Sequence, residues 1–336
     1  MSQLSLSLYR TGTRLKALRS LYSLRPEEVD AFMNAYQLFD GDWTNENGKR
    51  EEQIIDYYNV LNHLCSLGTV EKMYFPPYTD PNTGVTGNQV AFEQKMMEDL
   101  GVGPGMRVLD IGCGRGRVAH HVASHSGADV TGINLDPSQL ASATEYAGLT
   151  GYQSKCHFQQ ASLNDRLPFA DETFDAAYEI QAFSYCKDKV AVFSEVLRVL
   201  KPGARFSYLD WVLLPAFDAS NPEHTDLVRR AAPLLGSVDN PPLQDVIQSM
   251  EKAGFEIELS ENPSLEGQQH QLISAEDRYF HWLRNAIGAA AKLRVVPTYF
   301  PMLMDRLMKN ADALITVDRL GIGTTAYHIV CRRPEA

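Results

Sequence analysis

The chain of 336 residues lacks the sequence features that would identify a membrane-spanning, nucleic-acid-binding or repeat protein at once. It has no run of about 18 consecutive apolar residues, which a membrane-spanning helix needs. Its 31 lysines and arginines are outnumbered by 42 aspartates and glutamates, so the formal net charge is −11 and the basic surface of a dedicated nucleic-acid binder is missing. There is no internal repeat and no low-complexity tract. We expect a globular protein of one large or two modest domains.

Cysteine is also scarce. The five thiols are odd in number and lack the paired spacing of metal ligands; they are Cys65, Cys113, Cys156, Cys186 and Cys331. This pattern is typical of reduced thiols in an intracellular protein. We therefore predict no metal site, no disulfide framework and a cytoplasmic location.

The most informative stretch is residues 106–116, Met-Arg-Val-Leu-Asp-Ile-Gly-Cys-Gly-Arg-Gly. Its apolar residues from Val108 to Ile111 predict a buried parallel strand. The three glycines that follow leave the turn without Cβ atoms, so a ligand can approach the backbone closely. The next segment, 116–126, predicts a helix whose amino terminus would favour a carboxylate or phosphate.

The glycine spacing separates two cofactor classes. The dinucleotide pattern G-x-G-x-x-G would need a glycine where the chain has Arg117. Instead, Gly112, Gly114 and Gly116 follow Asp110, an order that resembles motif I of the Rossmann-like S-adenosylmethionine methyltransferases. Asp110 could accept hydrogen bonds near the cofactor's ammonium group. The alternative is a glycine turn that only closes a strand–helix corner.

Strand and helix patterns alternate after this motif, which is typical of a parallel α/β sheet. Predicted strands lie at 106–111, 128–134, 156–160, 174–180, 205–212, 255–259 and 326–331, and predicted helices at 116–126, 137–148 and 188–200. Lys201-Pro-Gly203 predicts a turn between the helix and the fifth strand.

Further helices are expected on both sides of this core, at 26–36, 51–67, 88–100, 222–235, 241–253, 274–292 and 300–315. A polar loop is predicted at 40–47. The segment 68–87 is rich in proline and glycine, and we expect it to form a mobile cover. Aromatic residues and methionines between 274 and 315 favour a lid over an apolar substrate pocket, with ordinary helix packing as the alternative.

The first 26 residues carry five basic side chains and no acid. Such a segment could be a targeting peptide or a basic helix on a membrane surface. Leu15, Leu18 and Tyr22 recur at helical spacing, which favours a plain helix laid on the domain.

Several stretches together resemble one family, the sterol 24-C-methyltransferases. They are Tyr57-Tyr-Asn59, Leu109 to Gly116, Gly132-Ile-Asn-Leu135, Leu167-Pro-Phe169, Phe174-Asp175, Glu195 to Gly203, Trp211-Val212, Asn221-Pro-Glu-His224 and Ala253-Gly-Phe255. The resemblance implies a class I, Rossmann-like methyltransferase fold with a seven-stranded, mainly parallel sheet. The implied parts are a helical segment with a cover loop (1–87), a cofactor-binding core (88–213), a substrate cap that contributes strand 255–259 (214–325) and the last strand (326–336).

The resemblance also implies the residues that bind S-adenosylmethionine. Asn134 would bind the ribose hydroxyls, Leu135 would lie against the adenine, and Tyr58 would close over the methyl donor. Ser162 stands where the family has an aspartate, and Gln181 where it has a glutamate. The complete implied set is Tyr58, Asp110, Gly112, Gly114, Gly116, Asn134, Leu135, Gln139, Ser162, Leu163 and Gln181.

The chain departs from the family at two aromatic stretches. Of the run that matches 64–75, only Tyr74 and Phe75 remain aromatic, and a second stretch near 266–272 has become Glu-Gly-Gln-Gln-His-Gln-Leu. Aromatic faces stabilise cations. We therefore expect a changed hydrophobic substrate, such as a terpenoid, a meroterpenoid or a prenylated alkaloid of specialised metabolism.

The leading hypothesis is C-methylation of an isoprenoid alkene, with rearrangement or cyclisation of the resulting cation left open. Glu179, Tyr185 and His281 are the candidates for the base or for cation stabilisation. The alternatives are an O- or N-methyltransferase for a small metabolite, and a cofactor-binding protein without catalysis. A homo-oligomer and peripheral contact with the endoplasmic reticulum membrane are also left open.

Overall fold

The computed structural model describes residues 3–39, 49–68 and 70–335, so the predicted polar loop at 40–47 lies outside the described residues. A seven-stranded sheet runs through the molecule in the order β3-β2-β1-β4-β5-β7-β6. The strands are β1 (Arg107–Ile111), β2 (Asp129–Asn134), β3 (Cys156–Gln160), β4 (Phe174–Ile180), β5 (Leu200–Leu213), β6 (Glu256–Glu261) and β7 (Gly323–Arg332). β7 is antiparallel to both neighbours, and the other pairs are parallel. The predicted mainly parallel α/β sheet is confirmed.

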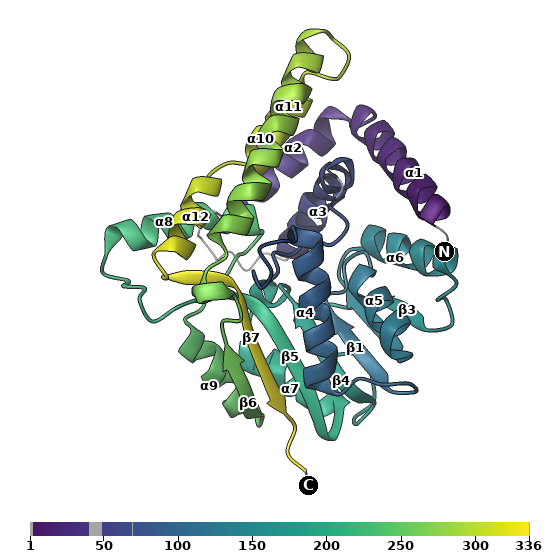
Figure 1. The fold of residues 1–336 in the computed structure, drawn as a ribbon, viewed down its shortest axis with the longest axis vertical. Coiled ribbons are helices and arrows are strands. Elements are labelled where there is room, and N and C mark those ends of the chain that lie inside the picture. Colours follow the sequence, from purple (N-terminus) through teal and green to yellow (C-terminus); the bar gives the residue numbers. More distant parts are fainter. Residues whose placement is uncertain (1–2, 40–48, 69, 336) are drawn as a thin grey trace.

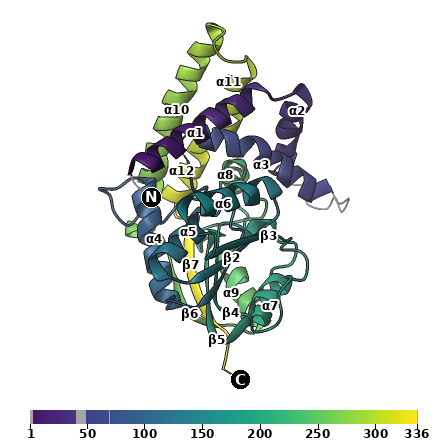
Figure 2. The same ribbon diagram turned by 90° about the vertical axis from the view of Figure 1, so that its right-hand side faces the viewer.

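Helices cover both faces of this sheet (Figures 1 and 2). Helices α7 (Lys189–Val199) and α9 (Leu243–Ala253) bury Phe193, Val196 and Met250 against one face. On the other face α4 (Val85–Leu100) and α5 (Arg117–Ser126) bury Met96 and Val122. The central strands β1, β4 and β5 are therefore buried on both sides, which explains their mainly apolar sequences, whereas the edge strands β3 and β6 are partly exposed and more polar.

A second helical layer stands over the carboxyl ends of the parallel strands (Figure 1). It contains α1 (Gln3–Tyr22), α2 (Pro26–Ala35), α3 (Lys49–Leu67), α8 (Pro222–Leu235), α10 (His270–Lys292), α11 (Tyr299–Leu307) and α12 (Ala311–Arg319). In this layer, helices from the amino-terminal and carboxyl-terminal parts of the chain pack together. Phe32, Tyr57 and Leu64 belong to the same apolar cluster as Phe300 and Leu303. The amino-terminal helices and the carboxyl-terminal cap thus share a core. α6 (Pro137–Thr150) lies below this layer, beside the cofactor motif.

Several of the predicted boundaries differ from the observed ones. The predicted helix 300–315 is divided into α11 and α12, because Asn310 takes a left-handed conformation with φ 70°, which asparagine tolerates better than most residues. The predicted turn at Lys201–Gly203 is part of β5, which begins at Leu200 and pairs with β4 through a register shift. From Leu200 to Arg205 β5 advances five residues while β4 advances two from Phe174 to Ala176, so this stretch, which includes Gly203 with its positive φ of 76°, is an irregularity larger than a one-residue bulge.

The helix predicted at 274–292 begins earlier, at His270. The reason is a distant carboxylate: Asp318 Oδ2 accepts hydrogen bonds from the backbone amides of Gln269 (2.7 Å) and His270 (2.6 Å). Amides at a helix start have no partner within the helix, so Asp318 of α12 supplies it.

The first segment is a helix laid on the domain, as the favoured interpretation predicted. Leu15 is 63% exposed and Tyr22 43%, whereas Ala17 and Leu21 are buried. Leu18 packs against the amino-terminal apolar cluster. Of the three residues at helical spacing, Leu18 and Tyr22 contact the helical layer, since the Tyr22 ring lies 5.3 Å from that of Phe300, and Leu15 points to solvent.

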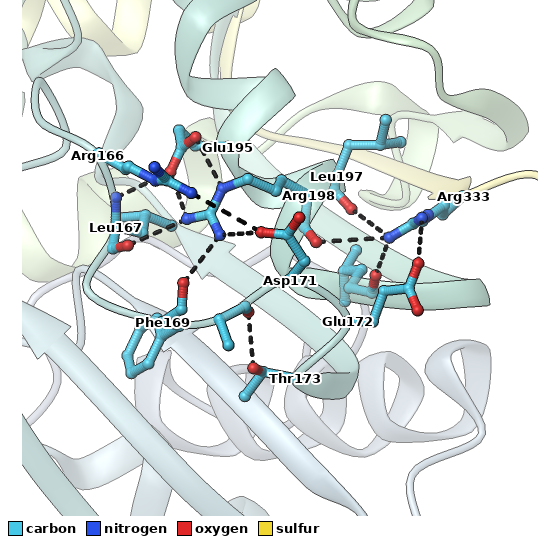
Figure 3. Close-up of polar contacts among 12 residues, drawn as sticks. Arg166, Leu167, Phe169, Asp171, Glu172, Thr173, Glu195, Leu197, Arg198 and Arg333 are labelled. Atoms are coloured by element: carbon cyan, nitrogen blue, oxygen red, sulfur yellow. Dashed lines mark hydrogen bonds and ion pairs between the residues drawn. The ribbon is translucent and has the colours of Figure 1, made fainter.

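The Leu167-Pro-Phe169 motif has a structural role (Figure 3). Arg198 of α7 donates to the carbonyls of Leu167 (3.1 Å) and Phe169 (2.8 Å) and to the carboxylate of Asp171 (2.7 Å). Glu195 accepts from Arg198 and from the Leu167 amide, and its hydrogen bond with Arg198 lowers the pKa of its carboxyl group. This network fixes the segment that leads into β4.

Candidate active site

A cavity of about 140 Å³ lies at the carboxyl ends of β1, β2 and β4, and the glycine turn forms one of its walls. All three glycines have positive φ, at 79° for Gly112, 50° for Gly114 and 68° for Gly116. They differ in what a side chain would meet. A Cβ at Gly112 would stand 2.4 Å from Ala182 Cβ, whereas one at Gly114 would meet nothing closer than 3.8 Å. Gly114 therefore leaves open space on the cavity side, where a cofactor can approach the backbone.

Asp110 lies at the base of this cavity and is 3% exposed. Its Oδ2 atom has no hydrogen-bond partner among the described residues, and burial raises the pKa of the carboxyl group to about 7. A buried carboxylate oxygen without a partner is costly unless a ligand satisfies it. The site therefore fits the ammonium end of S-adenosylmethionine.

A chain of side-chain amides connects the cavity with α3. Asn134 donates to Gln139 Oε1 (2.7 Å), and Gln139 Nε2 donates to Asn62 Oδ1 (2.9 Å). Asn62 in turn donates to Asp136 Oδ2 (3.3 Å). Asn134 and Gln139 line the cavity as expected. Sequence reasoning missed Asn62, because its partners are 74 and 77 residues away and no local pattern marks it.

The adenine end predicted for the cavity contains an acid that sequence reasoning missed. Ser162, Leu163 and Leu135 line this region together with Glu51 of α3. The Ser162 hydroxyl donates to Glu51 Oε1 at 2.7 Å. A carboxylate is therefore present beside Ser162, although it comes from another element than the family's aspartate.

Two tyrosines close the cavity from the side of the helical layer. Tyr58 of α3 and Tyr185, which follows β4, both line it, and their hydroxyl oxygens are 3.3 Å apart. Burial raises the pKa of both phenols, so both hydroxyls are neutral donors at physiological pH.

Gln181 lines both the cofactor cavity and a second, mainly apolar cavity, and its backbone has a positive φ of 54°. Its side chain accepts from the Phe75 amide (3.1 Å) and donates to the carbonyls of Phe75 (2.8 Å) and Thr325 (2.6 Å). The side chain thus holds the 70–84 segment against the sheet. Its predicted contact with the cofactor stays a prediction.

The second cavity, of about 170 Å³, is mainly apolar and is lined by residues of α3, α8, α10 and α11. It shares Tyr58, Lys72, Met73, Tyr74 and Gln181 with the cofactor cavity. Five aromatic side chains line it: Tyr57, Tyr58, Tyr74, Phe75 and Phe280. The expected lid therefore has a counterpart in the structure, although Trp282, one of the residues that suggested it, points outward and is 64% exposed.

The segment predicted as a mobile cover is held by many side chains. Glu93 of α4 is fully buried and accepts from Lys72 Nζ (2.7 Å) and from the Tyr74 hydroxyl (2.7 Å), and it also contacts His121. Gln89 Nε2 donates to the carbonyls of Lys72 and Tyr74. These contacts favour a fixed wall, and opening of the segment stays a prediction.

The three catalytic candidates lie in different environments. Glu179 is completely buried and lines neither cavity; its carboxylate accepts from the amides of Ala182 (3.0 Å) and Leu209 (3.1 Å). His281 is exposed on α10, where it contacts Asp277, and also lies outside both linings. Tyr185 alone lines the cofactor cavity. Glu179 thus lies away from both cavity linings, with its carboxylate engaged by an amide that follows β4 and by one of β5, and its predicted catalytic role stays a prediction.

Sequence reasoning missed another carboxylate. Glu276 of α10 lines the apolar cavity one helical turn from Phe280, and burial raises its pKa. Within the described residues it forms no hydrogen bond or ion pair. The signal that could have found it is the i, i+4 relation to the aromatic residues of the predicted lid.

Three further observations concern the cysteines, metal sites and membrane-spanning helices. The five cysteines are buried and free. Across residues 3–39, 49–68 and 70–335, no group of three or more histidine, cysteine or acidic side chains could hold a metal ion. No helix in the described part of the chain combines the length and apolarity needed to cross a bilayer.

Comparison with known proteins agrees with this geometry. A family model described as a methyltransferase domain matches residues 109–208, the part that contains the glycine turn and most of β1 to β5. The crystal structure of the [4+2]-cyclase SpnF superposes with a TM-score of 0.68 at 21% identity, covering 85% of this chain and 97% of that chain. The protein is therefore an S-adenosylmethionine-dependent methyltransferase of the class I fold.

Two related proteins show which methyltransferases the chain is similar to over most of its length. The chain is 28% identical over 308 residues to methyltransferase phqN of Penicillium fellutanum, covering 84% of this chain and 90% of the relative. It is 27% identical over 301 residues to the sterol 24-C-methyltransferase of Yarrowia lipolytica, covering 83% and 78%. The predicted resemblance to the sterol 24-C-methyltransferases is confirmed.

Proposed function

We propose that the protein transfers a methyl group to a carbon of an isoprenoid alkene held in the apolar cavity. The observation that carries the proposal is the shared wall of Tyr58, Lys72, Met73, Tyr74 and Gln181, which places the apolar cavity directly beside the cofactor cavity. The similarity to an enzyme named for methylation at carbon 24 of a sterol supports it.

Bound S-adenosylmethionine would supply an electrophilic methyl group. The chain's own residues would position it: Asp110 receives the ammonium group, the open side of Gly114 admits the cofactor, and Asn134 hydrogen-bonds the ribose. Tyr58 and Tyr185 shield the site from water on the side of α3. A dry, ordered site of this kind supplies much of the rate of methyl transfer through positioning.

The aromatic residues of the apolar cavity suit an alkene that becomes cationic. The family's aromatic run is largely absent between 64 and 75, but Tyr57 and Phe280 join Tyr74 and Phe75 around the cavity. Ring faces stabilise cations in desolvated surroundings. The ring set is nevertheless different from the family's, which supports a terpenoid or another prenylated compound in place of a sterol.

We assign the proton acceptor to Glu276. Its carboxyl group faces the apolar cavity, and burial raises its pKa, which makes the carboxylate a stronger base. Glu179 is less suited because two backbone amides already occupy its oxygens. Tyr185 and His281 remain the other candidates.

The test uses methyl-labelled cofactor with geranyl, farnesyl and prenylated indole acceptors, followed by assignment of the labelled atom. Glu276→Gln should lower kcat by about 10²–10⁴-fold, the usual contribution of a general base, with cofactor affinity unchanged. Asp277→Asn is the comparison variant: Asp277 also lines the apolar cavity, but it contacts His281, whereas Glu276 has no partner among the described residues, so this change should lower kcat less. Label on oxygen or nitrogen would favour the small-metabolite alternative. Label on carbon with normal turnover of Glu276→Gln would direct the search for the base to Tyr185.

A cytoplasmic location, peripheral contact with the endoplasmic reticulum membrane and self-association also remain proposals. The first two are tested by cell fractionation with and without high salt. Light scattering of the purified protein tests the third.

A further inference from the structure

The hairpin of α10 and α11 carries an unusual concentration of exposed apolar side chains. It projects beyond the rest of the helical layer in both views (Figures 1 and 2). At its end the four consecutive residues Lys292 to Val295 are all exposed, with Leu293 at 76% and Val295 at 62%. Trp282 and Met302 are also exposed, farther from the tip along the two helices. Such a patch usually marks an interaction surface.

The charge of the hairpin is opposite to that of the chain. From His270 to Leu307 the hairpin has five lysines and arginines and three acids, and its outer part, from Arg278 to Met304, has four lysines and arginines and no acid, although the whole chain has a net charge of −11. Arg284 is paired with Asp305, whereas Lys292 and Arg294 form no ion pair with any described residue. The two cations alternate with Leu293 and Val295 along the tip.

A second basic element packs against the hairpin. The Tyr22 hydroxyl of α1 donates to the Val295 carbonyl, and the Tyr299 hydroxyl donates to the Leu21 carbonyl at 2.6 Å. From Thr11 to Arg25 this part of the chain has four basic residues and no acid. Of these, Lys16 pairs with Glu145 and Arg25 with Glu28, while Arg14 and Arg19 form no ion pair with any described residue, so the local excess of positive charge extends onto α1 through those two arginines.

We propose that the tip of this hairpin, residues 292–295, docks on the surface of a bilayer that contains anionic lipid. Apolar side chains that alternate with cations at an exposed turn can enter the headgroup region while the cations meet lipid phosphates. A second copy of the chain fits less well, because a symmetric contact would bring Lys292 and Arg294 of both copies together.

The inference gives the proposed function a route for its substrate. The amino-terminal half of α10 lines the apolar cavity with Ile273, Glu276 and Phe280, and its carboxyl-terminal end carries the tip. One helix thus connects the docking surface with the cavity for a hydrophobic acceptor. The route rests on the proposed function, but binding to vesicles is measured without any acceptor, so the two can fail separately.

The experiment is flotation of the full-length protein with vesicles of phosphatidylcholine, with and without 30 mole per cent phosphatidylserine (about a third of the lipid, chosen to set a negative surface potential). We expect binding to the anionic vesicles that weakens as salt is raised. Lys292→Ala with Arg294→Ala should weaken it about 30-fold, because each basic residue near the surface contributes about fivefold. Leu293→Asp with Val295→Asp should abolish it.

Leu149→Asp is the matched control, since Leu149 is 54% exposed on α6 and lies outside the hairpin. It should bind vesicles like the wild type. All variants should keep the wild-type circular dichroism spectrum and affinity for S-adenosylhomocysteine. Equal binding by wild type and Leu293→Asp/Val295→Asp would overturn the proposal. The proposal would also be overturned if the wild-type protein floated with neither kind of vesicle and instead formed a dimer that Leu293→Asp/Val295→Asp dissociates.

Discussion

Replacing Asp110 by asparagine tests the cofactor site most directly, because stability and affinity should move in opposite directions. Asp110 is 3% exposed and its pKa is about 7 in the folded protein, raised mainly by burial. The pKa of an unfolded aspartate is about 3.9. The folded state therefore holds its proton at pH values where the unfolded state has lost it, and stability falls as the pH rises from about 4 to about 7.

The magnitude follows from the pKa shift. About three pKa units correspond to roughly 4 kcal/mol of stability lost above pH 7. The substituted asparagine would not ionise, so Asp110→Asn should unfold at a higher temperature than the wild type at pH 8, with up to about 4 kcal/mol in its favour. The difference should vanish near pH 4, where the carboxyl group is largely neutral in the folded wild type and only half ionised in the unfolded chain.

Cofactor affinity should show the opposite effect. The ammonium group needs the ionised carboxylate, which is about one tenth populated at pH 6 and about nine tenths at pH 8. Wild-type affinity for S-adenosylhomocysteine should therefore rise about tenfold over this interval. Asp110→Asn should remove most of this dependence and weaken binding at pH 8 by roughly 10- to 100-fold, the usual effect of losing one charge-assisted hydrogen bond.

Calorimetric titration and thermal unfolding at pH 4, 6 and 8 measure both quantities. Glu251→Gln, an exposed carboxylate on α9, is the control and should change neither. Affinity that is independent of pH in the wild type and unchanged in Asp110→Asn would refute the assignment of Asp110 to the ammonium group. A lower stability of Asp110→Asn at pH 8 would refute the argument from desolvation.

The remaining predictions concern the glycine turn and a buried carboxylate. Gly114→Val should abolish cofactor binding, since its side chain would enter the open cavity, and should cost stability only through its positive φ of 50°; Gly112→Val should destabilise the fold more, because its Cβ would also collide with Ala182. Binding of S-adenosylhomocysteine by Gly114→Val would contradict the first, and an unchanged unfolding temperature of Gly112→Val the second. Glu93→Gln should cost about 3–5 kcal/mol in denaturant unfolding, because it leaves the nearly buried Lys72 without its counter-charge. An unchanged denaturation midpoint would show that Lys72 finds another partner.

The sequence alone predicted those parts of the protein that depend on near neighbours in the chain. Strand β1, Asp110 and the three glycines lie within residues 107–116, and both the strand and the turn conformations follow from local side-chain size. The order of strands and helices, and with it the sheet, follows from the same short-range patterns. The likeness to motif I was therefore readable from the order of residues by itself.

Only the tertiary structure decided which buried polar groups still have an atom available to bind a ligand. Glu179 ends an apolar strand just as Asp110 does, but its neighbour β5 supplies the Leu209 amide to its carboxylate, whereas Asp110 keeps an oxygen without a partner among the described residues. Glu51 reaches the cofactor cavity from a helix 111 residues before its partner Ser162, and Glu276 reaches the apolar cavity from the cap. Hydrogen bonding and desolvation act between atoms in contact, and the fold alone brings such distant residues into contact.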